Sequence, residues 1–332
     1  MIFRVPILAL LLVAALAAVV ALWSSGFAIS VLRRWNLGDT GAAQLRRERM
    51  TELVSTLFGA VMMAELAALL LFVFNADRMA ALFVGAMCAV GTLGVNPYGF
   101  PALYLKIAVF FAAVLWLVLD RADKMARDYP LTRIKYGAIL GIAVLVLADG
   151  ATELTYFLNL KTDVITSCCS KLFVPANEGI ADELASVSPG MALVWLAVTG
   201  ALVALAGGIS LWSGRFHAVF AGLSAAMFGV GLMAVISVIS SYVYEHPNHH
   251  CPFCILKPEY GYFGYALYVP LFVGTASGLG AGMLSFFARI PSLQDPLPDL
   301  MRTMTRISLG GFATFGLACL WAIWRSNLIL FG

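Results

Sequence analysis

The sequence predicts an all-α fold, a polytopic transmembrane helix bundle of eight or nine spans, with nine as the best count. Of its 332 residues, 61% are hydrophobic and only 12% are charged, whereas soluble domains have about 25% charged residues. The mean hydropathy is +0.91. Long apolar runs alternate with short polar segments, and a helix needs about 20 apolar residues to cross a bilayer. A water-soluble fold is therefore excluded.

Nine stretches have the length and apolar character of membrane-spanning helices. In order they are Ile7 to Leu32, Thr51 to Phe74, Met79 to Val95, Ala102 to Leu119, Tyr136 to Phe157, Met191 to Trp212, Ala218 to Tyr242, Tyr262 to Ala288, and Ile307 to Leu330. The first stretch is too long for the core of a signal peptide, so we interpret it as a retained span. The third is short and rich in glycine, which makes eight the alternative count. Residues 1–332 are predicted to form a single integral membrane domain.

The distribution of Lys and Arg between the loops predicts the orientation, because short cytoplasmic loops are rich in both. The segment from Asp120 to Lys135 is the most basic loop and is predicted to be cytoplasmic. Counting spans from it places the loops at 159–190 and 244–260 together on the extracytoplasmic face of the inner (cytoplasmic) membrane. Five arginines disagree with this scheme: Arg33, Arg34, Arg46, Arg47 and Arg49. They indicate either an interfacial helix or a span count that is off by one before residue 80.

Cysteines are the residues most suggestive of chemistry. Four of them lie in the two extracytoplasmic loops, namely Cys168 and Cys169 in the first and Cys251 and Cys254 in the second, where His246, His249 and His250 precede them. A Cys-x-x-Cys turn brings two sulfurs within bridging distance, and free backbone amides at a helix start stabilise a thiolate. On an oxidising face this pattern favours a redox pair. The other two, Cys88 and Cys319, stand alone in apolar stretches and are predicted to be small buried hydrophobes.

The segment Cys251-Pro252-Phe253-Cys254, followed by an aromatic-rich span, resembles the Cys-x-x-Cys motif of quinone-coupled disulfide-forming membrane enzymes, the DsbB and vitamin K epoxide reductase families. The resemblance covers this motif and the following span. It implies a membrane thiol/disulfide oxidoreductase that passes electrons from a periplasmic dithiol to a membrane quinone. Cys254 would face the quinone with Cys251 as its partner, and Cys168 with Cys169 would be the shuttle pair.

Other residues are candidates for parts of the same reaction. The aromatic side chains of Tyr260, Tyr262, Phe263 and Tyr265 would bind the quinone ring or, alternatively, belong to an aromatic belt at the membrane interface. Charged residues are costly inside spans and often functional. Asp149 and Glu153 lie four residues apart, hence on one face of a helix. They would hydrogen-bond across a helix contact, accept the protons released as thiols oxidise, or pass ions. Glu65 and Lys106 are predicted to pair with each other.

Two other functions stay open. The four loop cysteines with His246, His249 and His250 would suit a soft or borderline metal such as copper, zinc or mercury, in a binding or transport protein. Alternatively, disulfides would staple the two loops in a structural subunit of a larger respiratory complex. The predicted partners are membrane lipid together with a periplasmic thiol protein or respiratory-complex subunits. A net charge of +3 gives no indication of nucleic acid binding.

Overall fold

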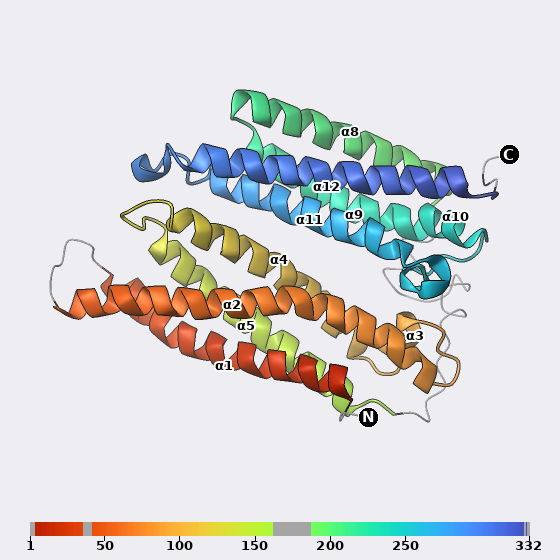
Figure 1. Ribbon diagram of the computed structural model, residues 1–332, viewed down its shortest axis with the longest axis horizontal. Helices are drawn as coiled ribbons and strands as arrows, with labels where there is room; N and C mark the ends of the chain where they lie inside the picture. Colours follow the sequence, from red (N-terminus) through yellow and green to blue (C-terminus); the bar gives the residue numbers. More distant parts are fainter. Residues whose placement is uncertain (1–3, 36–41, 162–186, 329, 331–332) are drawn as a thin grey trace. The chain divides into compact units, whose positions relative to one another are not determined.

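The computed structural model describes residues 4–35, 42–161, 187–328 and 330, and within these ranges every regular element is a helix. Eight helices in the described ranges are long and apolar enough to cross a membrane, which confirms the all-α multi-pass fold (Figure 1). They are α1 (Val5–Arg34), α2 (Ala42–Met79), α4 (Gly99–Asp123), α5 (Thr132–Leu158), α8 (Pro189–Ser213), α9 (His217–Ala234) with its continuation to Tyr244, α11 (Phe263–Ser285) and α12 (Leu297–Arg325).

The helices fall into two compact units, each described here by itself. The N-terminal unit contains α1, α2, α4 and α5 together with residues 289–297. The C-terminal unit contains α8, α9, α11, most of α12, and the short segment 85–91. Because segment 85–91 leaves its sequence neighbours to join the C-terminal unit, it becomes important for the site described below.

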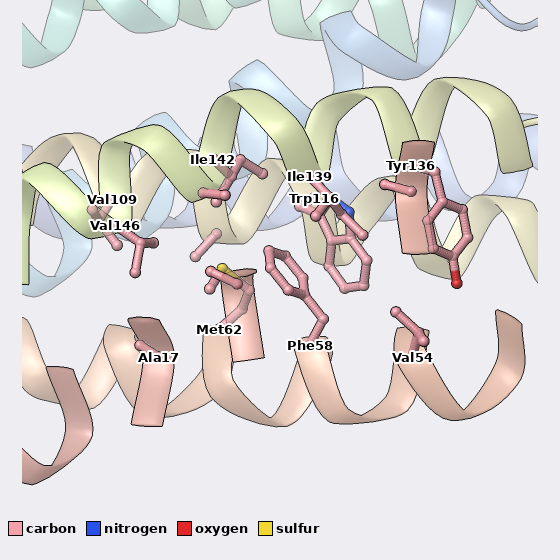
Figure 2. Packing of buried hydrophobic residues seen from close by; sticks show 14 of the residues in the cluster. Ala17, Val54, Phe58, Met62, Val109, Trp116, Tyr136, Ile139, Ile142 and Val146 are labelled. Atoms are coloured by element: carbon pink, nitrogen blue, oxygen red, sulfur yellow. The ribbon is translucent and has the colours of Figure 1, made fainter. Parts of the chain in front are cut away.

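The core of the N-terminal unit is filled by large side chains where α2, α4 and α5 meet (Figure 2). Phe58 of α2 places its ring edge-on to Trp116 of α4, with ring centroids 4.7 Å apart. Met62 lies one turn further along α2, and Ile139 of α5 belongs to the same cluster. Because lipid is as apolar as these side chains, close packing rather than water exclusion holds such helices together.

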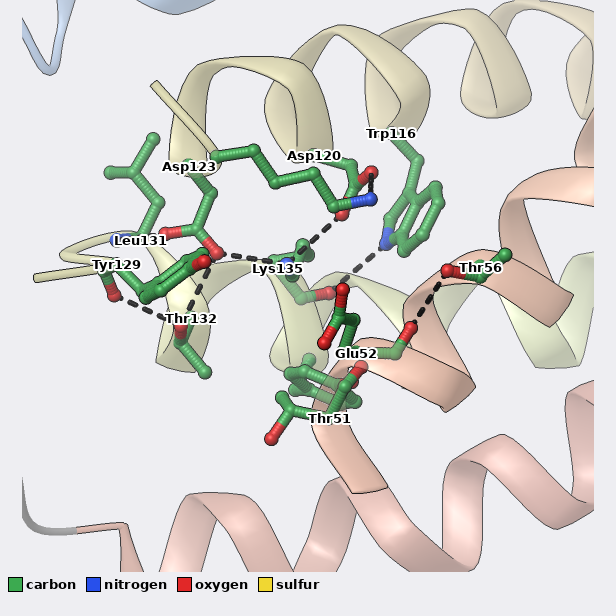
Figure 3. A network of polar contacts seen from close by, with 12 residues as sticks. Thr51, Glu52, Thr56, Trp116, Asp120, Asp123, Tyr129, Leu131, Thr132 and Lys135 are labelled. Atoms are coloured by element: carbon green, nitrogen blue, oxygen red, sulfur yellow. Dashed lines mark hydrogen bonds and ion pairs between the residues drawn. The ribbon is translucent and has the colours of Figure 1, made fainter. Parts of the chain in front are cut away.

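Ion pairs connect the end of α4 to the start of α5 at one end of the N-terminal unit. We call the four residues that form them the balanced cluster: Asp120, Asp123, Lys124 and Lys135 (Figure 3). The Lys135 Nζ lies 2.8 Å from Asp123 Oδ2 and 3.0 Å from Asp120 Oδ1. The Lys124 Nζ contacts the second oxygen of Asp120 at 2.6 Å. Asp123 also accepts a hydrogen bond from the backbone N–H of Leu131. Two carboxylates and two ammonium groups cancel, so the cluster closes the α4–α5 loop without residual charge.

The predicted span from Met79 to Val95 is wrong. In that range, α2 ends at Met79 and is followed by a 3-10 turn (Ala80–Leu82), an irregular segment with a turn, and the five-residue helix α3 (Ala89–Leu93). Gly85 has a φ of 84°, a left-handed conformation that breaks a helix. A five-residue helix rises only about 8 Å and cannot cross a bilayer. The described part of the chain thus has the lower predicted number of spans, eight.

Hydrogen bonds show which helix ends lie together in the N-terminal unit. The guanidinium of Arg133, at the start of α5, donates to the carbonyl of Trp35, just after α1, at 2.7 Å. The Arg47 side chain, near the start of α2, donates to the Arg34 carbonyl at 3.0 Å. The arginines around the α1–α2 connection therefore lie at the same end as the basic α4–α5 loop. The nine-span scheme, which placed them on opposite faces, is wrong because it counted the broken segment after α2 as a span.

In the C-terminal unit, glycines let α11 approach its neighbours closely. A Cβ atom added at Gly278 would overlap the Ser224 side chain of α9, and one at Gly282 would overlap Ala221. The Ser308 hydroxyl of α12 donates to the Gly274 carbonyl at 2.6 Å. Small residues spaced four apart are a common device for close packing of membrane helices.

Replacing Gly278 with leucine is therefore expected to destabilise the C-terminal unit. Overpacking of this kind lowers the free energy of unfolding by about 1–3 kcal/mol. Thermal unfolding of the purified chain in detergent measures the effect. Gly229→Leu, on α9, is the matched control because a Cβ there meets nothing within 4 Å. Equal melting temperatures for the two variants would contradict the packing role of Gly278.

Candidate functional site

Three buried cysteines of the C-terminal unit meet at one point. The sulfur atoms of Cys88, Cys251 and Cys254 all lie within 4.8 Å of one another, and the Cys88 and Cys251 sulfurs are 3.4 Å apart. Their exposed fractions are 0%, 2% and 8%. None of the three forms a disulfide with another cysteine in the described part of the chain. We call them the cysteine cluster.

The loop that carries Cys251 and Cys254 is held in place by two tyrosines. Tyr244, the last residue of α10 (Ser240–Tyr244), donates its hydroxyl to the Cys251 carbonyl. Tyr268 of α11 donates to the Pro252 carbonyl at 2.7 Å. Both bonds reach backbone carbonyls inside the Cys-x-x-Cys turn. The two thiols are therefore positioned by helices on either side of the loop rather than by the loop alone.

The third thiol reaches the cluster from the segment that sequence analysis took for a span. Cys88 directly precedes α3 and is fully buried. The prediction that it stands alone in an apolar helix is wrong, because the helix breaks before it. It is the residue that sequence reasoning missed. The available signal was the short, glycine-rich character of the stretch around it.

The surroundings of the cluster are apolar and aromatic. Ala86, Val90, Tyr244, Phe253 and Tyr260 pack against the three cysteines. A low-dielectric pocket of this kind disfavours charge on the sulfurs unless a cation accompanies it.

Neither thiol of the Cys-x-x-Cys turn is activated in this environment. The hydrogen bond with the Cys254 thiol and then burial raise the pKa of Cys251 well above the ordinary thiol value, despite the opposing hydrogen bond with Cys88. The hydrogen bond with Cys251 lowers the pKa of Cys254, but the contact with Cys88 and burial outweigh it, and the net shift is also upward. Both thiols are therefore protonated at neutral pH, contrary to the thiolate expected from the sequence. Cys254 begins only a three-residue 3-10 turn (Cys254–Leu256).

The histidines that precede the motif have local contacts of their own. The His249 ring stacks on Tyr244 with centroids 4.0 Å apart. His250 places Nδ1 3.1 Å from the Ile236 carbonyl, and His246 accepts a hydrogen bond from the Asn248 backbone N–H. Among the described residues, the group of His, Cys, Asp and Glu that could share one ion consists of the three cysteines. Cys168 and Cys169 lie outside the described residues.

The aromatic residues predicted to bind a quinone point to different neighbours. Tyr260 packs against the cysteine cluster. Phe263 instead packs against Trp321 of α12, with ring centroids 5.1 Å apart. The rings of Tyr262 and Tyr265 lie next to each other, with centroids 6.4 Å apart. Of these four, Tyr260 is therefore the one that contacts the thiols.

The predicted proton acceptors belong to the N-terminal unit, where they form a second polar group. The Lys106 Nζ lies 2.8 Å from Asp149 Oδ2, 2.8 Å from Glu153 Oε2 and 3.6 Å from Glu65 Oε2. The expected ion pair of Lys106 with Glu65 is present, but its N–O distance is the longest of the three. We call these four residues the buried quartet.

Comparison of the chain with protein-family models, with curated proteins and with solved structures found no match. The function proposed below therefore rests on the geometry and chemistry of the chain's own residues.

Proposed function

We propose that the chain is a multi-pass membrane protein that binds a thiophilic metal ion with a filled d shell, Zn(II), Cu(I) or Hg(II), through Cys88, Cys251 and Cys254. The observation that supports this is the convergence of three buried sulfurs within 4.8 Å. Zn–S bonds of about 2.3 Å in a tetrahedral site place sulfurs about 3.8 Å apart. The Cys88–Cys251 sulfur distance of 3.4 Å is close to that separation.

The burial and protonation of the thiols favour metal binding over attack on a soluble partner. A thiol must be deprotonated and accessible to exchange disulfides. Cys88, Cys251 and Cys254 are buried, and the pKa values of Cys251 and Cys254 are raised. A metal ion displaces the protons and supplies positive charge directly at the sulfurs, in apolar surroundings. A divalent ion with three thiolates leaves a single negative charge, and a tetrahedral ion keeps a fourth position for water or another donor.

The distribution of basic residues supports an extracytoplasmic position for the cluster. With eight spans, the loops that carry Cys88 and Cys251 share one face, and most basic residues lie at the other. The latter are Arg33, Arg34, Arg46, Arg47, Arg49, Arg121, Lys124, Arg127, Arg133, Lys135, Arg215, Arg289, Arg302 and Arg306. Of the described basic residues, the cysteine face holds Arg4, Arg78, Lys161, Lys257 and Arg325. The positive-inside rule then makes the face with most of the basic residues cytoplasmic and the cysteine face extracytoplasmic.

A second candidate function is thiol oxidation coupled to a membrane quinone. It is favoured by the 3.4 Å approach of Cys88 to Cys251, which lets a third thiol exchange with a Cys251–Cys254 disulfide, and by the contact of Tyr260 with the cluster. Oxidation of two thiols to a disulfide releases two electrons and two protons, which would reduce a quinone to the quinol. The dithiol substrate would come from a periplasmic protein.

Metal titration at several pH values distinguishes the two functions. For the purified, unreduced chain we expect one Zn(II) or Cu(I) per chain and protection of the three thiols from alkylation. Because each thiol ligand must lose its proton and at least two of them have raised pKa values, the apparent affinity is expected to rise at least about 100-fold per pH unit between about pH 6 and about pH 8. A readily reversible Cys251–Cys254 disulfide with no bound metal would refute the metal site and support the quinone-linked reaction. The choice between zinc and copper follows from comparing the two titrations.

A further inference from the structure

The buried quartet carries more negative than positive charge. Glu65, Asp149 and Glu153 surround the single ammonium group of Lys106, and none of the four residues is more than 2% exposed. With every group ionised, the net charge is therefore minus two. An uncompensated charge in a low-dielectric interior is so unfavourable that ionisable groups become neutral instead.

Several oxygens of the quartet have no hydrogen-bond donor among the described residues. They are Glu65 Oε1, Asp149 Oδ1 and Glu153 Oε1, together with Glu65 Oε2 and Glu153 Oε2, which face the Lys106 ammonium only as ion-pair partners at 3.6 Å and 2.8 Å. All five belong to side chains that are at least 98% buried. A carboxylate oxygen buried without a donor loses its hydration without compensation. If one of these carboxyls carries a proton, it becomes a donor and can satisfy the oxygen of a neighbour.

The balanced cluster in the same unit provides an internal comparison. There, Asp120 and Asp123 are matched by Lys124 and Lys135, so no further positive charge is needed. The quartet lacks a second cation. Of the helices packed in this unit, α2 contributes Glu65, α4 contributes Lys106, and α5 contributes the other two carboxyls. Between Arg4 and Arg33, α1 has no charged residue.

We infer that the buried quartet is a proton-binding site, and that at neutral pH it holds two exchangeable protons on its three carboxyl groups. A proton fits the geometry better than a second metal cation. Lys106 already occupies the centre, with its Nζ 2.8 Å from two of the carboxylates, and would repel another cation. A sodium or calcium ion would also need several oxygen ligands at once, whereas a proton needs one or two.

The position of the quartet gives the protons a short route to one face. Glu153 lies five residues before the end of α5 at Leu158, a rise of about 8 Å. Asp149 lies one turn deeper on the same face of α5. Protons would therefore exchange with the side on which α5 ends, and pass from Glu153 to Asp149 and Glu65 around Lys106. This inference is independent of the function proposed for the cysteine cluster.

Infrared spectroscopy of the purified full chain tests the inference, because a protonated carboxyl has a C=O band distinct from that of a carboxylate. We expect such a band at neutral pH, shifted in heavy water. Charge counting predicts that Glu153→Gln and Asp149→Asn each reduce it about twofold, from two protons to one, while Lys106→Gln raises it by about half. Using two amide variants keeps the test valid if one of them fails to fold.

Asp120→Asn, in the balanced cluster, is the matched control and should leave the band unchanged. Absence of the band in the unmodified chain, or a band that neither amide variant reduces, would overturn the inference. Recording the same spectra with sodium replaced by N-methylglucamine tests whether the quartet binds sodium instead of protons. A band that grows on removal of sodium would mean that the quartet holds a metal cation, which would also overturn it.

Discussion

Replacing Cys88 with serine is expected to weaken binding of Zn(II) or Cu(I) by more than about 100-fold. Loss of a residue that only supports a metal ligand reduces affinity by about 10–100-fold, and loss of a ligand itself costs more. Serine keeps the size of the side chain at this fully buried position but offers a hard, protonated oxygen that such ions bind poorly. Competition titration with a chromophoric chelator measures the change.

Cys319→Ser is the matched control for this experiment. Cys319 is another buried cysteine of the C-terminal unit, but it lies within α12 and outside the cysteine cluster. Its replacement should leave the metal affinity unchanged. If Cys88→Ser binds as tightly as the unmodified chain, Cys88 is not a ligand and the three-sulfur site is wrong. If both variants lose binding, the effect comes from the fold rather than from the cluster.

Replacing Lys135 with methionine is expected to lower the free energy of unfolding by about 3–5 kcal/mol, the range for removal of one partner of a buried ion pair. The change leaves Asp123 without its cation and Asp120 with only Lys124. The Lys135 side chain is 3% exposed, so water cannot replace the lost contacts. Chemical unfolding in detergent, followed by tryptophan fluorescence, measures the effect.

Lys124→Met provides the comparison, because Lys124 pairs with the same Asp120 but its side chain is 38% exposed. Pairs in water contribute about 0–1 kcal/mol, so this variant should be near neutral. Adding Asp123→Asn to Lys135→Met should recover part of the loss, since the amide oxygen can still accept from the Leu131 N–H. Equal effects of the two lysine variants would contradict the structural role of Lys135.

Eight spans could be predicted from hydropathy because each is a long apolar run between polar ends. The range from Met79 to Val95 was wrongly predicted to be a span, for a physical reason. Apolar residues are as suitable for a protein core as for lipid, and Cys88 and Ala89 are fully buried in protein. Hydropathy measures the preference for leaving water and does not reveal which of these two environments a segment enters. The arginines after α1 were the indication that the count was wrong.

The motif at Cys251 and Cys254 could be recognised because its two residues are close in sequence. The third member of the cysteine cluster could not be recognised, because Cys88 and Cys251 are 163 residues apart and nothing in the local sequence marks them as neighbours. The spacing of Asp149 and Glu153 correctly placed both on one face of α5, where both contact Lys106. Glu65 and Lys106 join this pair because of the way the helices pack. The spacing of residues within one helix cannot predict that packing.

The π-helical turn η2 (Val235–Ile239) between α9 and α10 determines the direction in which α10 presents its side chains. A π-turn amounts to one inserted residue in an α-helix, which rotates everything after it by about 100°. Tyr244 follows this turn and holds the Cys251 carbonyl, and the Ile236 carbonyl within it faces His250. The orientation of the loop that carries Cys251 and Cys254 thus depends on the register of a helix outside that loop. A single-residue deletion there would turn Tyr244 away while leaving every cysteine in the sequence.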